Sequence, residues 1–457
     1  MVKVRHQRAF YEKPAIVKHS VGTNNRLGRL ASAFPHTVID GVPVDELVHR
    51  YGSPLWVVSE ITLRSKYQSM YRAFSLRYPR VAVAYSYKTN YLSGVCSILH
   101  QEGAWAEVVS GFEYEIALAL GVPGDKIIFN GPLKRPEELA RAISQGAMVN
   151  LDSYDELAVV EQLAEKMGRA VPVGVRVNMT VGPLTWDRFG FNLENGQALQ
   201  ACQRVLASPT LKLVGLHAHV GTFILDPGLY RQMAEKLGGL ARYLADLGVT
   251  LEYLDVGGGF ASHNTLHDQW MPAEYATPSF EQYADAICPT LINMLPQPLP
   301  LLLMEPGRAL VDESMCLLTS VVSTKLLSSG QKGVVLDAGI NLLPTSVWYR
   351  HEVRLAGETG TPTDGGVMEE VNLYGPLCMN IDVIQFRTAL PPVRRGAVLV
   401  IKNVGAYNFT QSMQFIQPRP AVVLVNGGEV ECIRAPETTA YLRELERIPQ
   451  RLLTKPA

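Results

Sequence analysis

The sequence predicts an α/β protein, a parallel (β/α)8 barrel with a second, C-terminal β-rich domain. Eight short apolar runs alternate with helical patterns over roughly 230 residues, which favours a closed parallel barrel. After about residue 310, strand-like runs separated by Gly and Pro replace the helical periodicity. The 457-residue chain is also too long for one ordinary core. We therefore assign residues 50–310 to the barrel and residues 1–49 and 311–457 to the β-rich domain. A doubly wound open sheet is the alternative.

The elements follow in order along the chain. A strand at residues 54–58 and an amphipathic helix at 60–78 precede the barrel. The barrel strands are predicted at residues 81–84, 106–109, 127–129, 148–151, 173–177, 213–219, 253–256 and 301–304. Helical patterns between them include residues 113–120, 136–144, 154–167 and 229–247. The β-rich domain is expected to include strands at residues 333–336, 397–404 and 421–424 and a short charged helix near 438–447.

The composition is that of a soluble globular protein, with 47% hydrophobic residues, 19% charged residues and a formal net charge of −1. This balance gives no electrostatic reason to expect nucleic acid or a membrane surface as a partner. No apolar run approaches the about 18 residues of a membrane span, and the first twenty residues contain no apolar core of a signal peptide. The six cysteines form no CxxC pair, which argues against a zinc ribbon or a disulfide framework. We expect a cytoplasmic protein.

Lys88 stands at the carboxyl end of the first predicted barrel strand, where active sites of such barrels lie. Desolvation there is expected to lower the pKa of its amine and so to increase the neutral, nucleophilic fraction. Such an amine suits a Schiff base with a carbonyl group or with pyridoxal phosphate. The alternative is a lysine that merely extends from a strand end into solvent.

Three further polar clusters follow barrel strands: residues 217–222, 255–260 and 305–308. The glycines Gly257, Gly258 and Gly259 would let backbone N–H groups approach a phosphate. Glu305 could pair with a protonated heterocyclic nitrogen, while Arg308 could hold an anion.

His217 and His219 face the same side of a strand and could bind one metal ion, as in a metal-dependent hydrolase. However, the other histidines are scattered and supply no further ligands. An imidazole that stacks on a cofactor ring explains His219 better, and we predict no metal site.

Together these features resemble the fold type III, alanine racemase-like pyridoxal phosphate decarboxylases, most closely the diaminopimelate and ornithine decarboxylase group. The resemblance extends from about Gly41 to Val425 and rests on these motifs: Tyr85-Ser86-Tyr87-Lys88-Thr89-Asn90, His219-Val220-Gly221-Thr222, Gly257-Gly258-Gly259, Glu305-Pro306-Gly307-Arg308, Gly375-Pro376-Leu377-Cys378 and Gly405-Ala406-Tyr407. It implies a barrel plus a C-terminal β domain and a homodimer whose active sites lie at the interface.

The resemblance also implies roles for single residues. Lys88 would carry the cofactor as a Schiff base, and His219 would stack on the pyridine ring. The phosphate would be held by Thr222, the three glycines and Tyr407, and Arg308 would serve the phosphate, the substrate or both. Glu305 would keep the ring nitrogen protonated, which favours decarboxylation over racemisation. Cys378 would be the general acid contributed by the second subunit; the alternative is a small residue that fills a loop.

Three departures from the diaminopimelate decarboxylase pattern concern the far end of the substrate. Met379 stands where that family has glutamate, Thr345 where it has arginine, and Phe415 where it has tyrosine, whereas Tyr349 is retained. Of the substrate-binding positions Arg308, Thr345, Tyr349 and Met379, two have therefore lost a polar contact. We predict an amino-acid substrate that is larger, less polar or conjugated, from a specialised pathway, and not free meso-diaminopimelate. The alternatives are a pyridoxal phosphate-dependent racemase and a non-catalytic, decarboxylase-like regulatory protein.

Overall fold

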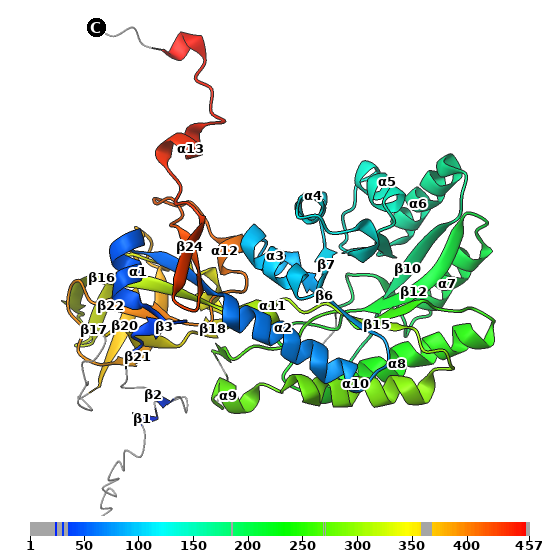
Figure 1. Ribbon diagram of the computed structural model, residues 1–457, viewed down its shortest axis with the longest axis horizontal. Helices are drawn as coiled ribbons and strands as arrows, with labels where there is room; N and C mark the ends of the chain where they lie inside the picture. Colours follow the sequence, from blue (N-terminus) through cyan, green and yellow to red (C-terminus); the bar gives the residue numbers. More distant parts are fainter. Residues whose placement is uncertain are drawn as a thin grey trace, which may run out of the picture.

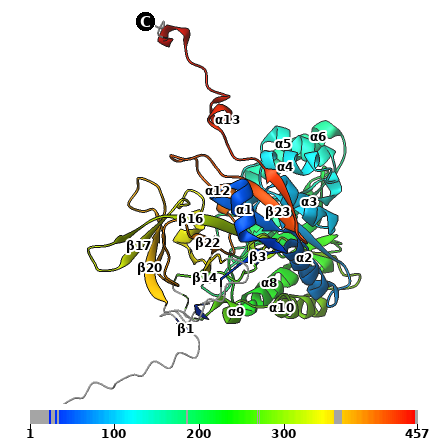
Figure 2. The same ribbon diagram turned by 60° about the vertical axis from the view of Figure 1, so that its left-hand side comes forward.

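The computed structural model describes residues 23–24, 30–31 and 35–453, except 184–185, 268, 270 and 358–367. A barrel surrounded by helices lies beside a body built mainly of β-strands (Figures 1 and 2). No helix within these residues is long and apolar enough to cross a membrane.

Eight parallel strands form the closed barrel, which confirms the predicted fold. In chain order they are β6 (Val81–Ser86), β7 (Trp105–Val108), β8 (Ile127–Phe129), β9 (Met148–Leu151), β10 (Val171–Asn178), β12 (Leu211–Ala218), β13 (Tyr253–Asp255) and β15 (Leu301–Met304). The pairing of β10 with β9 and of β15 with β6 closes the ring. Each strand overlaps one of the eight predicted apolar runs.

Helices cover the outside of the barrel between successive strands: α3 (Ser93–Gln101), α4 (Gly111–Ala119), α5 (Pro136–Ser144), α6 (Tyr154–Met167), α7 (Gln197–Ala207), α8 (Pro227–Asp246), α9 (Ala273–Ala276) and α10 (Phe280–Met294). Serine side chains at residues 110, 153 and 279 accept backbone N–H groups and begin α4, α6 and α10. Only the short α11 (Arg308–Val311) follows β15. The position of the missing eighth helix is taken by α2 (Glu60–Ser75), which packs between α3 and α10.

The second body is a β sheet in the order β21-β20-β17-β16-β5-β23-β24. Its strands are β5 (Leu55–Ser59), β16 (Met315–Leu326), β17 (Lys332–Leu336), β20 (Glu369–Tyr374), β21 (Val383–Leu390), β23 (Val422–Asn426) and β24 (Glu429–Arg434), and β22 (Val398–Ile401) pairs with β16 and β19 (Val353–Leu355). β5 pairs with β16 and β23. The predicted range of 50–310 therefore assigns this strand to the barrel, whereas its hydrogen bonds place it in the second sheet.

Short elements complete the chain: β1 (Thr23–Asn24), β2 (Leu30–Ala31), β3 (Val38–Ile39), β4 (Val42–Pro43), α1 (Val44–Tyr51), β11 (Phe191–Asn192), β14 (Thr265–Leu266), β18 (Tyr349–Arg350) and α12 (Asn408–Gln411). The predicted C-terminal helix is present but shorter, as α13 (Thr439–Arg443), and it projects away from both bodies (Figure 1).

Inside the barrel the side chains change character along the strands. A small apolar cluster that is separate from the main core is formed by Ala82, Ala84, Ile128, Val214, Tyr253 and Leu303. Further toward the carboxyl ends of the strands, the buried side chains are polar or charged, among them Glu107, Asn130, Asn150, His217, Asp255 and Glu305. Because parallel strands all end at the same mouth, these side chains converge there.

Candidate active site

Lys88 lies one residue into a short 3-10 turn (Tyr87–Thr89) directly after β6. Its Nζ is 2.8 Å from Oε2 of Glu107, and its side chain is 39% exposed. Burial lowers the pKa of the Lys88 ammonium, but the negative charges around it, Glu107 first, outweigh burial and raise the pKa above its ordinary value. The expectation of a lowered pKa is therefore wrong for the protein without cofactor, because a buried carboxylate faces the amine.

Glu107 was missed by the sequence analysis, although a charged residue within the predicted apolar run 106–109 was a signal. Ser86 Oγ donates a short hydrogen bond to it, and Asn130 Nδ2 donates to its other oxygen at 3.2 Å. Asn130 also donates to Glu305 Oε1. The amine and the predicted ring-nitrogen partner are thus joined through one asparagine in the barrel interior.

The three glycines after β13 are required by close approaches of the backbone. A Cβ at Gly258 would lie 2.4 Å from the carbonyl oxygen of Glu305, and one at Gly259 would lie 2.5 Å from that of Gly221. Gly257 and Gly259 also have φ values of +66° and +98°, which L side chains rarely adopt. This cradle of Gly257, Gly258 and Gly259 admits no side chain, because the protein's own backbone lies where a Cβ would be.

His219 lies just beyond β12, and its Nδ1 accepts the N–H of Gly258 at 3.0 Å. Burial, followed by the charges of Arg176 and Lys88, lowers the pKa of His219 to about 3. Its ring is therefore neutral at physiological pH and presents a flat face. The indole of Trp186, also missed by the sequence analysis, lies 5.3 Å from it between centroids at 57°.

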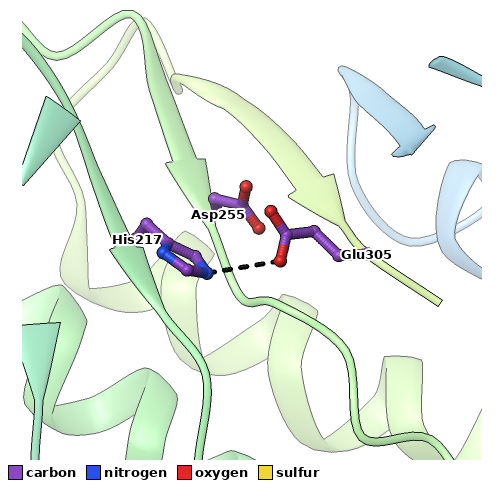
Figure 3. A group of neighbouring side chains, drawn as sticks. All are labelled: His217, Asp255 and Glu305. Carbon is purple, nitrogen blue, oxygen red and sulfur yellow. Dashed lines mark ion pairs between the residues drawn. The ribbon is translucent and has the colours of Figure 1, made fainter. Parts of the chain in front are cut away.

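Glu305 follows β15 and belongs to a buried group with His217 of β12 and Asp255 of β13 (Figure 3). His217 Nε2 is 3.3 Å from Glu305 Oε2. Within the described part of the chain this is the one group whose spacing could hold a metal ion. His219 is not a member, so the pair of histidines considered from the sequence does not form a joint metal site here.

Arg308 is buried at the start of α11 in a cage of aromatic rings. Its guanidinium carbon lies 4.9 Å from the ring centroids of Tyr349 and Tyr407 and 5.4 Å from that of Phe223. Asp312 is its nearest carboxylate, at 3.8 Å, and Nη1 has no hydrogen-bond partner among the described residues. A fixed cation with an unused donor is suited to an anion such as phosphate or carboxylate. Two predicted site residues, Tyr349 and Tyr407, thus form part of this cage around Arg308. Thr222, which lies beyond β12, is exposed.

The remaining predicted residues lie on the β-rich body. Cys378 is exposed and Met379 half-buried in the loop between β20 and β21, which Asp382 holds by accepting the N–H groups of Ile340 and Leu377. No hydrogen bond, ion pair or ring contact among the described residues joins Cys378 or Met379 to the barrel group. Thr345 is fully buried, and its Oγ1 is 2.7 Å from Asn408 Oδ1 and 3.0 Å from His351 Nε2. Within this chain Thr345 is a structural residue of the β-rich body.

Pyridoxal phosphate fits the barrel group. An amine with access to solvent, a glycine cradle, a neutral imidazole face, a buried carboxylate and a caged arginine surround one mouth. These groups match its aldehyde, phosphate, ring face, ring nitrogen and negative charge in turn.

Comparisons with known proteins agree with this reading. The family model described as pyridoxal-dependent decarboxylase, pyridoxal binding domain, matches residues 62–312. The chain is 32% identical over 436 residues to a diaminopimelate decarboxylase of Methanothermobacter thermautotrophicus, covering 92% of this chain and 97% of that protein. It is 30% identical over 421 residues to one of Aquifex aeolicus, covering 89% and 94%. The crystal structure of M. jannaschii diaminopimelate decarboxylase in complex with L-lysine superposes with a TM-score of 0.82 at 30% identity, covering 91% and 97%.

Proposed function

Since the chain belongs to the pyridoxal-dependent decarboxylases, we propose that it removes the α-carboxylate of an amino acid that is larger, less polar or conjugated, rather than of free meso-diaminopimelate. The cofactor of this family is pyridoxal phosphate, whose ring, when bound, withdraws the electrons left on the α-carbon as CO2 departs. The curated relatives, at 30–32% identity, are named for diaminopimelate, so the choice of substrate needs its own test.

We assign the cofactor to the barrel mouth. Lys88 would bind it covalently, the loop of Gly257, Gly258 and Gly259 would lie against its phosphate, and Glu305 would pair with its ring nitrogen. Before the cofactor arrives, Glu107 anchors the Lys88 ammonium at 2.8 Å and so fixes the position of the amine. Lys88 must give up a proton before it can act as a nucleophile, and the raised pKa makes that loss more favourable at higher pH.

The substrate proposal rests on the burial and the hydrogen bonds of Thr345. In the resembling family, this position supplies an arginine for the distal carboxylate. Here it supplies a hydroxyl that is fully buried and already bonded to Asn408 and His351. The nearby cation, Arg350, is no replacement: Tyr349 packs on Arg308, and the next residue in a strand points to the opposite face.

We propose further that the enzyme is a homodimer in which Cys378 of one subunit serves the barrel of the other as general acid. Cys378 is exposed, and no hydrogen bond among the described residues joins it to the barrel group of its own chain. Large apolar side chains are exposed on the same body, among them Trp348, Ile381, Phe386, Phe415 and Ile416. Exposed apolar side chains of this size would be covered if a second chain packed against this body.

The test is CO2 release by the purified, cofactor-loaded enzyme on a panel of free meso-diaminopimelate, apolar amino acids and N-conjugated or carrier-linked amino acids. We expect a lower kcat/KM for free diaminopimelate than for the best apolar or conjugated substrate. If diaminopimelate is turned over fastest, the substrate proposal is wrong. Loss of optical activity without CO2 would instead indicate a racemase.

A single substitution should move the specificity back toward diamino substrates. Met379→Glu places a carboxylate where the resembling family meets the distal ammonium, and we expect kcat/KM for diaminopimelate to rise by about 10-fold or more. Asn380→Glu adds the same charge one residue away and is the matched control. An equal rise in both variants would show a general charge effect and would count against a role for Met379.

A further inference from the structure

Glu305 lies in the barrel interior with a polar side chain facing each of its two oxygens. Asn130 donates to Oε1, and the imidazole of His217 approaches Oε2 at 3.3 Å (Figure 3). His217 and Glu305 are 1% and 4% exposed, so solvent does not compete for these contacts. A carboxylate accepts about four hydrogen bonds, which leaves room for Asp255 and one further donor.

Asp255 meets Glu305 in an unusual way, because two carboxyl groups share one buried space. Its Oδ1 accepts the N–H of Gly257 at 2.9 Å, whereas Oδ2 receives no hydrogen bond from a donor of the described residues. Two carboxylates this close cannot both be charged in a buried site. One of the two carboxyl groups must therefore be protonated, and we assign the proton to Asp255, whose Oδ2 meets no donor. Burial, and then the charge of Glu305, raise the pKa of Asp255 well above its usual range.

The charge of Glu305 follows from the same contacts. Burial raises its pKa, but His217, the hydrogen bond from Asp255 and the Lys88 ammonium together outweigh burial and lower it below its usual value. Within this pair, Glu305 is thus the charged member and Asp255 the neutral one.

We propose that His217 and Asp255 are positioning residues that keep Glu305 ionised, with one oxygen reserved for the ring nitrogen of pyridoxal phosphate. This inference rests on the role proposed above for Glu305, and it is independent of which amino acid is decarboxylated. Asp255 also joins two parts of the cofactor site, since its other oxygen holds Gly257, the first residue of the phosphate cradle. Neither side chain touches the cofactor in this account; both act through Glu305.

The alternative use of this group is a metal ion, because its ligand atoms lie within 4.8 Å of one another. A metal ion would displace the proton from Asp255 and occupy the Glu305 oxygen that the ring nitrogen needs. Elemental analysis of the purified protein distinguishes the two cases: stoichiometric zinc or another transition metal would overturn the proposal.

The decisive experiment compares two cofactors. The full chain is stripped of cofactor and titrated with pyridoxal phosphate and with the analogue in which a CH group replaces the ring nitrogen, and binding is followed by absorbance. We expect His217→Leu to weaken binding of pyridoxal phosphate by about 10- to 100-fold and to leave binding of the analogue almost unchanged. Asp255→Leu also releases Gly257, so it should weaken binding of both cofactors, and that of pyridoxal phosphate by the larger factor. Asp255→Asn retains a neutral donor and should bind both cofactors like the wild type.

The control is Tyr253→Phe. Tyr253 lies on the same strand as Asp255, and its hydroxyl donates a buried hydrogen bond to Asn150 and not to Glu305. Any change in affinity that this substitution causes should be the same for pyridoxal phosphate and for the analogue. Equal weakening for both cofactors in the His217 and Asp255 variants, or no weakening, refutes the inference. If a leucine variant does not fold, we replace it by His217→Gln or by the pair Asp255→Asn and Asp255→Ala. The criterion stays the difference in affinity between pyridoxal phosphate and the analogue. Glu305→Gln tests the role of Glu305 separately from the roles of His217 and Asp255. If this variant weakens binding of pyridoxal phosphate and of the analogue equally, the proposed role of Glu305 itself is wrong.

Discussion

The two regions that together make up the proposed active site are built in opposite ways. At the barrel mouth, buried side chains from several strands hold one another through Glu107, Asn130 and Glu305, and the glycine loop has no room for a Cβ. On the β-rich body, Cys378 and Phe415 lie on loops with their side chains exposed. The difference indicates that cofactor chemistry is fixed by mutually dependent residues, whereas substrate selection depends on side chains that can be exchanged singly.

The largest effect is expected from a substitution at the barrel mouth. Lys88→Ala should abolish covalent attachment of the cofactor and lower the rate of CO2 release by at least on the order of 10³-fold. Borohydride reduction followed by mass spectrometry measures the attachment. Lys134→Ala, which removes another lysine from an ion pair with Glu156, should retain it. A reducible linkage that persists in Lys88→Ala would assign the cofactor to a different amine.

A smaller effect is expected from the loop. Cys378→Ala should lower kcat by about 100-fold, since it removes a general acid, and leave the affinity for pyridoxal phosphate unchanged. Cys432→Ala removes the other exposed cysteine and should be silent. Product formation at the wild-type rate in Cys378→Ala would leave this cysteine without a catalytic role.

Thr345→Val tests whether this residue stabilises the β-rich body or contacts the substrate. Its hydroxyl is buried and bonded twice, so its loss should lower the free energy of unfolding by about 1–3 kcal/mol with little change in KM. Thr388 has a buried hydroxyl without a hydrogen-bond partner among the described residues, and Thr388→Val should cost less. Urea unfolding and steady-state kinetics give both quantities. A raised KM with unchanged stability would contradict this assignment.

The last prediction concerns the pH dependence of stability. The pKa of His219 is lowered from 6.5 to about 3, so between these values the unfolded chain binds a proton that the folded protein does not. Stability should therefore fall as the pH falls below 6.5, by up to about 1.4 kcal/mol per pH unit from this residue. His219→Gln should reduce that slope in urea unfolding of the cofactor-free protein. Parallel pH curves for the two proteins would show that His219 is not the group responsible.

The sequence predicts the barrel well because its signal is local. Each strand is a short, mainly apolar run, and the glycines, Lys88, Glu305 and Arg308 follow the ends of such runs. It fails where the deciding contact comes from a distant residue. The raised pKa of Lys88 depends on Glu107, the buried state of Thr345 depends on Asn408, and the sheet membership of β5 depends on strands more than 250 residues away.

The placement of β5 has a consequence for how the protein is made. This strand leaves the ribosome before the barrel, but its neighbours β16 and β23 follow only after the whole barrel has been translated. The nascent chain must therefore carry an unpaired apolar strand, Leu55–Ser59, through most of its synthesis. Chaperones that shield such a segment, or slow translation after residue 310, would be expected to raise the yield of native enzyme.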